Sequence, residues 1–366
     1  MVDVAAVRSA IEEVQDPEIH KGLGELGMVR AVDVNDGTVD VTIALVIPGY
    51  PLQSTITSDV TAAAKAVDGV TSVNVVLASL SDEERAELSA SLRGGSAEDR
   101  DIQLAAAGSK VRIIGISSGK GGVGKSSVTA NLGVALANQG KRVGIIDADV
   151  WGFSIPKMMG VDRTPTVIND LLLPPQAHGV SVISMDFFVQ SDQAVVWRGP
   201  MLHKALEQFL VDVYWGDLDY LLIDMPPGTG DVAISISQYL PRSEILIVTT
   251  PQPTAQRVAV RAGLMAHKTN QDIIGVVENM SWFTGDDGKR YEIFGAGGGE
   301  GVANELEVPL LGQVPLVVSL REGADVGKPV TVVDPDGEAA DAFASLATHI
   351  VETGPRLRTH PELVIS

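Results

Sequence analysis

A glycine-rich segment, Gly119–Ser127, constrains the fold of this chain more than any other feature of its sequence. It reads GKGGVGKSS, follows the apolar run Val111–Ile116, and precedes Val128, Leu132 and Leu136, which recur at the spacing of one helix face. A glycine loop that leads from a buried strand into a helix and ends in Lys-Ser is typical of phosphate binding. Its glycines let backbone N–H groups converge on phosphate oxygens at the helix N-terminus. The sequence therefore predicts a strand, a loop and a helix that hold a nucleotide.

Further apolar runs after the glycine loop alternate with stretches of helical periodicity. These runs are Val143–Ile146, Tyr220–Ile223, Ile245–Val248 and Ile273–Val277. Strands that alternate with helices form a parallel sheet covered on both faces. We therefore expect residues 110–354 to be an α/β P-loop NTPase domain with a mostly parallel sheet between two helical layers. Residues 93–109 are expected to form a linker before it, and residues 355–366 a tail after it.

The N-terminal stretch has a different pattern, which predicts a small acidic α+β domain over residues 1–92. A helical spacing over Val4–Val14 precedes two alternating runs joined at Asn35-Asp36-Gly37, which is typical of a β-hairpin. Val73–Leu77 is expected to be a third strand. Ser81–Glu84 then spells a capping box, which predicts the start of another helix.

The composition excludes several classes of protein. The formal net charge is −20, and the chain contains no cysteine. A strongly negative chain repels nucleic acid and anionic membrane surfaces, so we expect no nucleic-acid and no membrane partner. Without cysteine there is no disulfide, no thiolate nucleophile and no thiolate metal ligand. No signal-like segment and no apolar run long enough to span a membrane are evident, so a cytoplasmic location is expected.

The end of the glycine loop and a later strand end predict where ATP and Mg²⁺ bind. Lys125 is expected to reach the β/γ-phosphates, and Ser126 to offer its hydroxyl to Mg²⁺. Asp224 ends a predicted strand, where a carboxylate can hold the same ion through water. The backbone of the following loop, Gly228-Thr229-Gly230, could meet the γ-phosphate and move when that phosphate leaves. The expected ATP contacts are Ser118, Gly119, Lys120, Gly121, Gly122, Val123, Gly124, Lys125, Ser126, Ser127 and Gly228.

Two more carboxylates, Asp147 and Asp149, follow the predicted strand Val143–Ile146, which is the first strand after the glycine loop. Both could face the metal ion and the attacking water, and the alternative is that they cap a helix or turn. A carboxylate with an ordinary pKa is a weak base at neutral pH, so Asp149 is expected to orient water in a slow hydrolysis. The expected Mg²⁺ ligands are Ser126, Asp147 and Asp224.

The same glycines also spell G-x-G-x-x-G, the fingerprint of a dinucleotide-binding fold. Asp147 then lies where such a fold would bind a ribose. Against this alternative, Lys125 and Ser126 would be superfluous, because backbone groups alone hold a pyrophosphate. The second acidic strand end, at Asp224, also has no role there. The P-loop interpretation is therefore preferred.

Longer motifs resemble one known family. The run from Lys120 to Ser126 resembles the deviant Walker A motif of the MinD, nitrogenase iron protein and arsenite ATPase group, whose extra lysine is Lys120 here. Segments resembling the Mrp/ApbC branch of that group are Asp147–Pro156, Val196–Met201, Asp224–Asp231 and Val277–Ser281. Segments resembling the small domain of iron–sulfur assembly factors are Asp16–Glu18, Leu26–Val29 and Ile47–Pro51.

This resemblance implies a homodimer that encloses ATP. Lys120 would reach the phosphate bound by the partner subunit, and the alternative is a merely solvated lysine. Asn279 would lie near the adenine edge, where an amide can pair with the base, and the alternative is a buried structural asparagine. The expected catalytic residues are then Lys120, Lys125 and Asp149. Apoprotein clients or iron–sulfur assembly partners are also implied.

The chain departs from the family at its cluster-binding positions. In the family, a dimer carries an iron–sulfur cluster between two Cys-x-x-Cys pairs and passes it to apoproteins. Here the stretch after Met280 reads SWFTGDDGK, and Tyr50 stands where members commonly carry a cysteine. The six histidines are dispersed, and oxygen ligands suit a soft cluster poorly, so no iron–sulfur ligand is expected. The glycine-rich run Gly295–Gly301 lacks a following Lys-Ser or Lys-Thr and is expected to be a flexible surface loop near the dimer partner.

Two functions remain open at this point. The first is a Mg²⁺-dependent ATPase that dimerises around ATP and serves iron–sulfur cluster carriage or assembly for apoproteins. The second is a cysteine-free nucleotide switch that presents an ATP-dependent dimer surface to a client without carrying a cluster. Both use the same P-loop, and they differ in whether iron–sulfur chemistry is involved.

Overall fold

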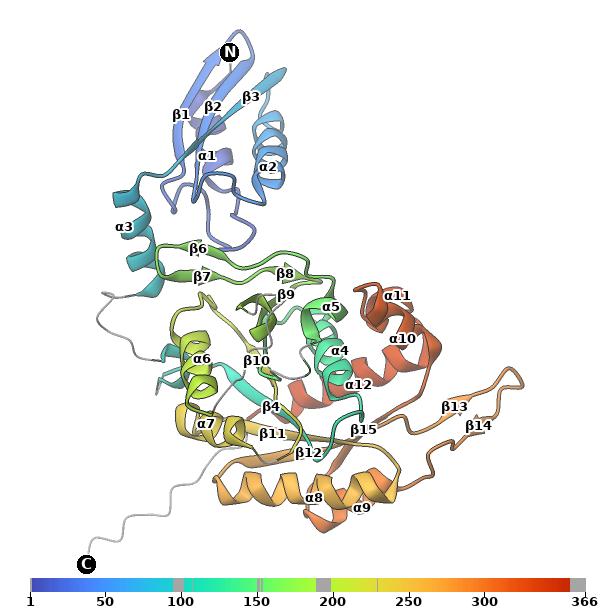
Figure 1. Cartoon of the computed structure of the whole chain (residues 1–366). Coiled ribbons are helices and arrows are strands. Elements are labelled where there is room, and N and C mark those ends of the chain that lie inside the picture. Colours follow the sequence, from blue (N-terminus) through green and yellow to red (C-terminus); the bar gives the residue numbers. More distant parts are fainter. Residues whose placement is uncertain are drawn as a thin grey trace, which may run out of the picture. The chain divides into compact units, whose positions relative to one another are not determined.

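The computed structural model describes residues 2–94, 102–106, 108–149, 152, 154–188, 199–228 and 230–355. Thr229, parts of the expected linker and tail, and parts of the motifs over 147–156 and 196–201 lie outside the described residues. The chain divides into two compact units (Figure 1). The first comprises residues 1–101, 164–175 and 212–216, and the second comprises residues 102–163, 176–211 and 217–366. None of the helices that the structure describes is long and apolar enough to cross a membrane.

The first unit is built on a three-stranded sheet in the order β1-β2-β3. β1 is antiparallel to β2, and β2 is parallel to β3. The expected hairpin is confirmed, because Asp36 and Gly37 have the positive φ angles, 47° and 82°, that a tight turn between twisted strands requires. The capping box at Ser81 and Glu84 is also present. The elements are α1 (Val4–Glu12), β1 (Val29–Asn35), β2 (Thr38–Leu45), α2 (Gln53–Lys65), β3 (Ser72–Ser79) and α3 (Asp82–Arg93).

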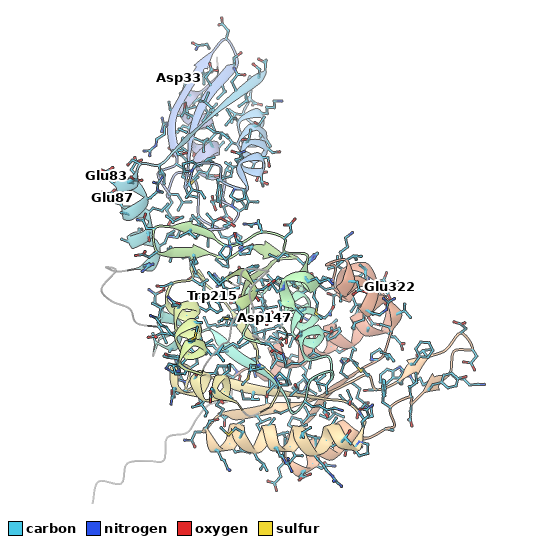
Figure 2. All side chains as sticks on the ribbon, viewed as in Figure 1. Asp33, Glu83, Glu87, Asp147, Trp215 and Glu322 are labelled. Carbon is cyan, nitrogen blue, oxygen red and sulfur yellow. The ribbon has the colours of Figure 1, made fainter. Side chains whose placement is uncertain are left out.

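A short hairpin from the middle of the chain also belongs to the first unit. It consists of β6 (Thr166–Ile168) and β7 (Leu171–Leu173), which pair antiparallel. Ile168, Leu171 and Leu173 are buried in the apolar cluster of the N-terminal residues. The first unit therefore draws part of its core from inside the range 110–354. Acidic side chains such as Asp33, Glu83 and Glu87 are exposed on this unit (Figure 2).

An eight-stranded sheet in the order β15-β12-β11-β4-β10-β5-β9-β8 forms the centre of the second unit. Neighbouring strands are parallel except for β8 and β9. Helices lie on both faces of the sheet (Figure 1), so the predicted α/β class is confirmed. The strands are β4 (Arg112–Ser118), β5 (Val143–Asp147), β8 (Gln176–Ala177), β9 (Val180–Ser184), β10 (Tyr220–Asp224), β11 (Glu244–Thr249), β12 (Asp272–Asn279) and β15 (Leu310–Val314). β8, β9 and β15 extend the sheet beyond the five strands expected from the sequence.

The helices of the second unit complete its core. α4 has buried residues on all sides and packs against both the sheet and α12, which explains its long apolar run. The helices are α4 (Lys125–Asn138), α5 (Ile155–Met159), α6 (Gly199–Val211), α7 (Asp231–Tyr239), α8 (Pro253–Lys268), α9 (Gly298–Glu305), α10 (Val318–Asp325), α11 (Val330–Val333) and α12 (Glu338–Thr353). Two 3-10 turns, η1 (Gln103–Ala105) and η2 (Met185–Phe188), and a hairpin of β13 (Phe283–Thr284) and β14 (Arg290–Tyr291) are also present.

The glycine-rich run Gly295–Gly301 matches its expectation as a surface loop only in its first three residues, which are exposed and lie outside any helix. Its last four residues form the first turn of α9, in which Gly298 and Gly299 are buried. Glu278, at the end of β12, accepts a hydrogen bond of 2.6 Å from the backbone N–H of Gly299, and a carboxylate at a helix N-terminus complements the partial charge there. A Cβ on Gly299 would lie 2.6 Å from the Cβ of Glu278. Close packing, not flexibility, therefore explains this glycine.

The register of the central strands positions the candidate site. Asp224 of β10 pairs with Asp147 of β5 on one side and with Ile116 of β4 on the other. The glycine loop leaves the sheet directly after β4, and parallel strands all end at one edge of a sheet. Two carboxylates and the glycine loop therefore meet at the carboxyl edge, where Figure 2 labels Asp147 inside the unit.

Candidate functional site

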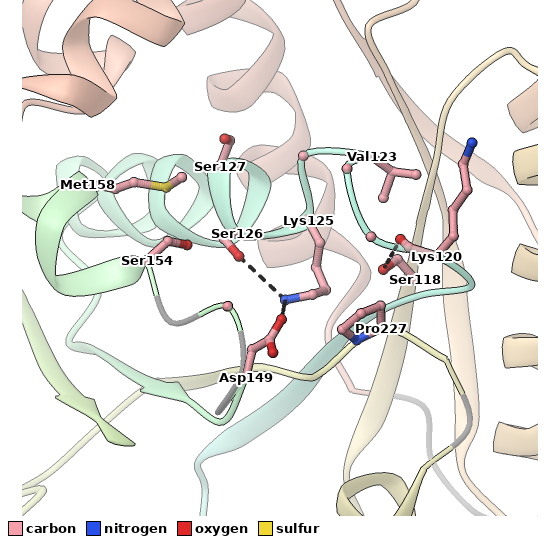
Figure 3. A pocket seen from close by; sticks show the side chains of 14 residues that line it. Ser118, Lys120, Val123, Lys125, Ser126, Ser127, Asp149, Ser154, Met158 and Pro227 are labelled. Carbon is pink, nitrogen blue, oxygen red and sulfur yellow. Dashed lines mark hydrogen bonds and ion pairs between the residues drawn. The ribbon is translucent and has the colours of Figure 1, made fainter. Parts of the chain in front are cut away.

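The glycine loop borders a cavity of about 360 Å³ at the carboxyl edge of the sheet (Figure 3). α4 begins at Lys125, and both Gly122 and Gly124 adopt left-handed backbone conformations, with φ of 81° and 78°. Glycine adopts such conformations without a steric penalty, which explains two of the motif's glycines. The cavity is lined by Ser118, Lys120, Gly121, Gly122, Val123, Gly124, Lys125, Ser126, Ser127, Asp149, Gly152, Ser154, Met158 and Pro227.

Asp224 organises the start of α4. The Nζ of Lys125 lies 2.7 Å from Oδ2 of Asp224, and the hydroxyl of Ser126 donates to the same oxygen at 2.6 Å. Thr129 donates to Oδ1 at 2.7 Å. Both oxygens of this fully buried carboxylate therefore have donors, and the lysine balances its charge. Thr129 was missed at the sequence level, although its place four residues after Lys125 puts it on the same helix face.

The donor set at this edge suits Mg²⁺. Mg²⁺ is a hard cation that prefers carboxylate, hydroxyl, phosphate and water oxygens. Ser126 and Asp224, two of the expected ligands, are in direct contact. Among the described residues, no group of three or more His, Asp or Glu side chains forms a ready metal site. A metal ion here would therefore need oxygens from the nucleotide and from water, as is usual for Mg²⁺ in such enzymes.

Asp147 holds the segment that follows β5. Its Oδ1 accepts from the backbone N–H of Asp149 at 3.3 Å, and its Oδ2 accepts from the N–H groups of residues 154 and 155 at 3.1 and 3.2 Å. The hydroxyl of Ser184 also donates to Oδ2, at 3.2 Å. Burial, and then the neighbouring charge of Asp224, raise the pKa of Asp147 to about 7. Since protein donors occupy both oxygens in this arrangement, its role as a Mg²⁺ ligand stays a prediction.

Asp149 and Lys120 lie at different sides of the cavity. Asp149 lines the cavity, and its Oδ2 is 3.9 Å from the Nζ of Lys125. Lys120 points away from Lys125 (Figure 3), and its Nζ donates to the side-chain oxygen of Gln252 at 3.2 Å. The backbone of Lys120 accepts a hydrogen bond from the hydroxyl of Ser118 at 3.1 Å. The proposed roles of both residues in catalysis stay predictions.

Three other expected ATP-contact residues, Gly119, Gly228 and Asn279, make contacts that hold the glycine loop in place. Gly119 does not line the cavity, because it packs against α8. The N–H of Gly228 donates to the carbonyl of Ser118 at 2.8 Å, which ties the loop after β10 to the end of β4. Asn279 is 3% exposed and donates from Nδ2 to the carbonyl of Val123 at 2.9 Å. The structure thus brings Asn279 to the phosphate loop, and its expected contact with adenine stays a prediction.

The segment after Met280, where the family resemblance places a cysteine pair, forms the hairpin of β13 and β14. The indole N–H of Trp282 and the hydroxyl of Thr284 both donate to Oε2 of Glu338, at 3.2 and 3.0 Å. The guanidinium of Arg290 stacks on Trp282, 4.0 Å from its ring centre. Hydrogen bonds and a cation–π contact therefore stabilise this hairpin without any metal ligand.

Tyr50, at the other expected cysteine position, is buried in the first unit beside two carboxylates. Its hydroxyl lies 3.2 Å from Oδ1 of Asp16 and 2.9 Å from Oε2 of Glu18. Burial raises the pKa of Asp16 and also the pKa of Tyr50. This cluster contains only oxygen donors, which suit a soft iron–sulfur cluster poorly.

Together, the parallel sheet, the glycine loop between β4 and α4, and the carboxylate at the end of β10 define a P-loop NTPase. Comparison with known families agrees. A model described as "NUBPL iron-transfer P-loop NTPase" matches residues 110–351, and one described as "Iron-sulfur cluster assembly protein" matches residues 4–75. The chain belongs to this family of iron–sulfur P-loop NTPases, and its resemblance to the Mrp/ApbC group is confirmed.

Individual relatives extend over nearly the whole chain. The "Iron-sulfur cluster carrier protein" of Mycobacterium tuberculosis is 50% identical over 350 residues, which cover 94% of this chain and 92% of the relative. The protein of the same name from Bacillus subtilis is 42% identical over 319 residues, covering 86% of this chain and 89% of the relative. Among solved structures, a nucleotide-binding protein from Archaeoglobus fulgidus in complex with ADP is 35% identical, with a TM-score of 0.57 over 67% of this chain and 96% of that one.

Proposed function

We propose that this chain is a Mg²⁺-dependent ATPase that dimerises around ATP and serves iron–sulfur cluster carriage or assembly for apoproteins. The observation that carries the proposal is the contact of Lys125, Ser126 and Asp224 at the mouth of the phosphate loop. The ADP complex of the Archaeoglobus relative supports the nucleotide, and the names of the curated relatives support the iron–sulfur role. They favour this role over a nucleotide switch that has no link to iron–sulfur chemistry.

Different residues around the cavity would bind the phosphates, hold Mg²⁺ and orient the attacking water. N–H groups of the glycine loop and the N-terminus of α4 bind the phosphates, and Lys125 leaves Asp224 to meet the β/γ-phosphates. Ser126 and Asp224 would hold Mg²⁺, which neutralises charge on the transferring phosphate. Asp149 orients the attacking water. Because positioning and charge, not a strong base, drive this reaction, we expect slow turnover.

Lys120 is the residue that would link ATP binding to dimerisation. In the free chain its ammonium donates to the side-chain oxygen of Gln252. We propose that it leaves Gln252 and binds the phosphates of the partner's ATP. This contact forms only when two subunits and nucleotide meet, so ATP binding and dimerisation become one equilibrium.

Sedimentation velocity with a nonhydrolysable ATP analogue and Mg²⁺ tests the dimer. Wild type should shift from monomer to dimer when the analogue is added. Lys120→Ala should bind the analogue and stay a monomer, whereas Lys125→Ala should fail to bind it. A wild-type sedimentation coefficient that is the same with and without the analogue would refute the dimer, and an unchanged dimer of Lys120→Ala would refute the role of the lysine.

The proposed role in iron–sulfur cluster carriage or assembly needs a different experiment, because the chain has no cysteine to hold a cluster. We propose that it acts on cluster transfer through its ATP cycle and its contacts with assembly partners, without ligating the cluster through thiolates. Anaerobic incubation with iron and sulfide, followed by iron counting, should leave the purified chain without a stable cluster. Stoichiometric, transferable iron on the chain would contradict this part of the proposal.

A further inference from the structure

α8 presents a row of basic side chains on a chain that is strongly acidic. The sequence contains 47 Asp and Glu against 27 Lys and Arg, yet α8 contains no acidic residue. Its opposite face packs through small buried residues against the sheet of the second unit (Figure 1). Exposed residues spaced by four, three and four positions follow one face of a helix. We call these residues, Arg257, Arg261, Leu264 and Lys268, the basic stripe.

The charges of the basic stripe have no partner within the part of the chain that the structure describes. There, Arg257, Arg261 and Lys268 form no hydrogen bond and no ion pair through their side chains. An exposed arginine elsewhere does form one, since Arg321 lies 3.0 Å from Asp325 on its own helix. α8 offers no carboxylate for such a pair. The basic stripe is therefore uncompensated positive charge around an apolar side chain that is 51% exposed.

α3, in the first unit, presents the complementary pattern. Glu83, Glu87 and Ala90 are exposed and lie at spacings of four and three residues along one face of this helix. Two other carboxylates of α3 already have arginine partners. Glu83 and Glu87, labelled in Figure 2, have none among the described residues. Residues 1–92 carry 15 Asp and Glu against 5 Lys and Arg, so the surroundings of this face are also acidic.

The exposed faces of α3 and α8 match position by position when the helices are aligned in parallel. Side chains four residues apart on any α-helix have their Cβ atoms about 6 Å apart, so two ion pairs form together. Three residues further along, the small side chain of α3 meets the exposed apolar side chain of α8. The facing pairs are Glu83 with Arg257, Glu87 with Arg261, and Ala90 with Leu264.

The apolar position decides between a parallel and an antiparallel alignment. An antiparallel alignment with two ion pairs would put Leu264 opposite Leu80, which precedes α3 and is only 4% exposed. The parallel alignment covers Leu264 with Ala90 and lets the helices approach closely. It also brings Lys268 to Gly94, the C-cap of α3. The carbonyl end of a helix carries partial negative charge, which suits a lysine.

We propose that the basic stripe of one copy of this chain binds the exposed face of α3 in a second copy. The contact needs no nucleotide, so it goes beyond the proposed dimer around ATP. Because each copy carries both surfaces, a two-fold pair forms both contacts at once. Such a pair keeps two copies together before ATP binds and raises their effective concentration for the ATP-dependent dimer. Nucleic acid, the other common ligand of a basic helix face, is repelled by the net charge of −20.

Sedimentation of the nucleotide-free full chain tests this contact with two double variants. Arg257→Glu with Arg261→Glu makes the stripe acidic, and Glu83→Arg with Glu87→Arg makes the α3 face basic. Wild type should associate as its concentration rises from about 10 µM to 1 mM, the range of a weak, small interface. Each double variant alone should associate at least about 10-fold more weakly, because like charges then face each other.

An equal mixture of the two double variants should associate as strongly as wild type. Each variant then meets opposite charge at both contacts, while the total charge of the mixture equals that of wild type. At about 0.15 M salt, net repulsion beyond about 8 Å is screened, whereas pairs in contact are screened less. A matched control, Lys65→Glu with Lys204→Glu, changes the net charge as the stripe variant does, at exposed lysines of α2 and α6. It should associate like wild type.

Thermal unfolding of each variant establishes that it is folded, and Arg257→Ala with Arg261→Ala replaces the reversed stripe if that variant is not. A wild type that stays monomeric up to the highest concentration would overturn the inference, as would a mixture no stronger than its components. A short DNA duplex is the polyanion probe. If wild type binds it, the stripe variant does not, and no self-association is seen, the stripe belongs to nucleic acid and the inference is overturned. Lys120→Ala should keep this contact, so its failure and the failure of the ATP dimer are separate results.

Discussion

Gly119→Ala should disrupt the nucleotide-binding unit although it adds only one methyl group. A Cβ at this position would lie 2.1 Å from the carbonyl carbon of Val258 and 2.4 Å from the backbone nitrogen of Ala259, both in α8. Ordinary contact begins at 3.4 Å, so the helix would have to retreat by about 1.3 Å. These neighbours are backbone atoms, which cannot rotate away as a side chain does. Overpacking of this kind costs about 3 kcal/mol, which lowers the thermal midpoint by about 6–12 °C for a unit of this size.

Gly121→Ala is the matched control in the same loop. A Cβ there would meet no atom within 4 Å, and the φ of Gly121 is not positive. The control should leave the thermal midpoint of the ligand-free chain unchanged or raise it slightly, because alanine restricts the unfolded chain. Calorimetric unfolding of wild type and both variants decides the question. Equal midpoints for Gly119→Ala and Gly121→Ala would refute the argument that α8 packs directly on the loop.

Three further changes test other parts of the structure. Thr129→Val should cost about 1–3 kcal/mol in chemical unfolding, because Oδ1 of buried Asp224 loses its donor; no loss would contradict that contact. Arg112→Met removes the guanidinium that balances the charge of buried Glu244 and should cost about 3–5 kcal/mol, which Arg112→Met with Glu244→Leu should largely restore. Because burial raises the pKa of Asp16, the protonated form stabilises the fold, and stability falls as pH rises through that raised pKa. Asp16→Asn should flatten this slope in unfolding curves recorded across acidic pH, and an unaltered slope would count against it.

Local patterns predicted the parts of the fold that are decided locally. The glycine loop, the strand that precedes it and the acidic end of β10 follow from motifs and apolar runs, because buried parallel strands are continuously apolar. β15, in contrast, is short and partly exposed at the sheet edge, so its residues lack a clear strand pattern. The hairpin of β6 and β7 packs into the apolar cluster of the N-terminal residues, including contacts with α3, and no local window can detect such distant partners.

The candidate site likewise contains residues that local motifs predicted and contacts that they did not. Lys125, Ser126 and Asp224 were predicted to act together and lie in contact. Thr129 and the loop contact of Asn279 were not predicted, since each depends on a partner about 95 to 156 positions distant. Family resemblance gave Asn279 a role but could not give the direction of its amide. That direction is set by packing against the glycine loop.

The arrangement after Met280 shows how a family motif can be replaced without loss of structure. Trp282, Thr284 and Arg290 form a hairpin that is attached to α12 through Glu338. Trp282→Ala should release this hairpin, and proteolysis at the loop should then be faster than in wild type. If the cleavage rate is unchanged, the anchoring contacts with Glu338 are not what holds the hairpin in place.

In the proposed dimer, each subunit binds its own ATP through Lys125 and completes the partner's site through Lys120. A complementation assay with two inactive variants tests it most directly. Lys120→Ala still binds ATP, and Lys125→Ala still offers Lys120, so a mixed dimer contains one complete site. We expect the mixture to hydrolyse ATP well above the sum of the separate variants. A mixture that shows only that sum would contradict a site completed by Lys120 of the partner.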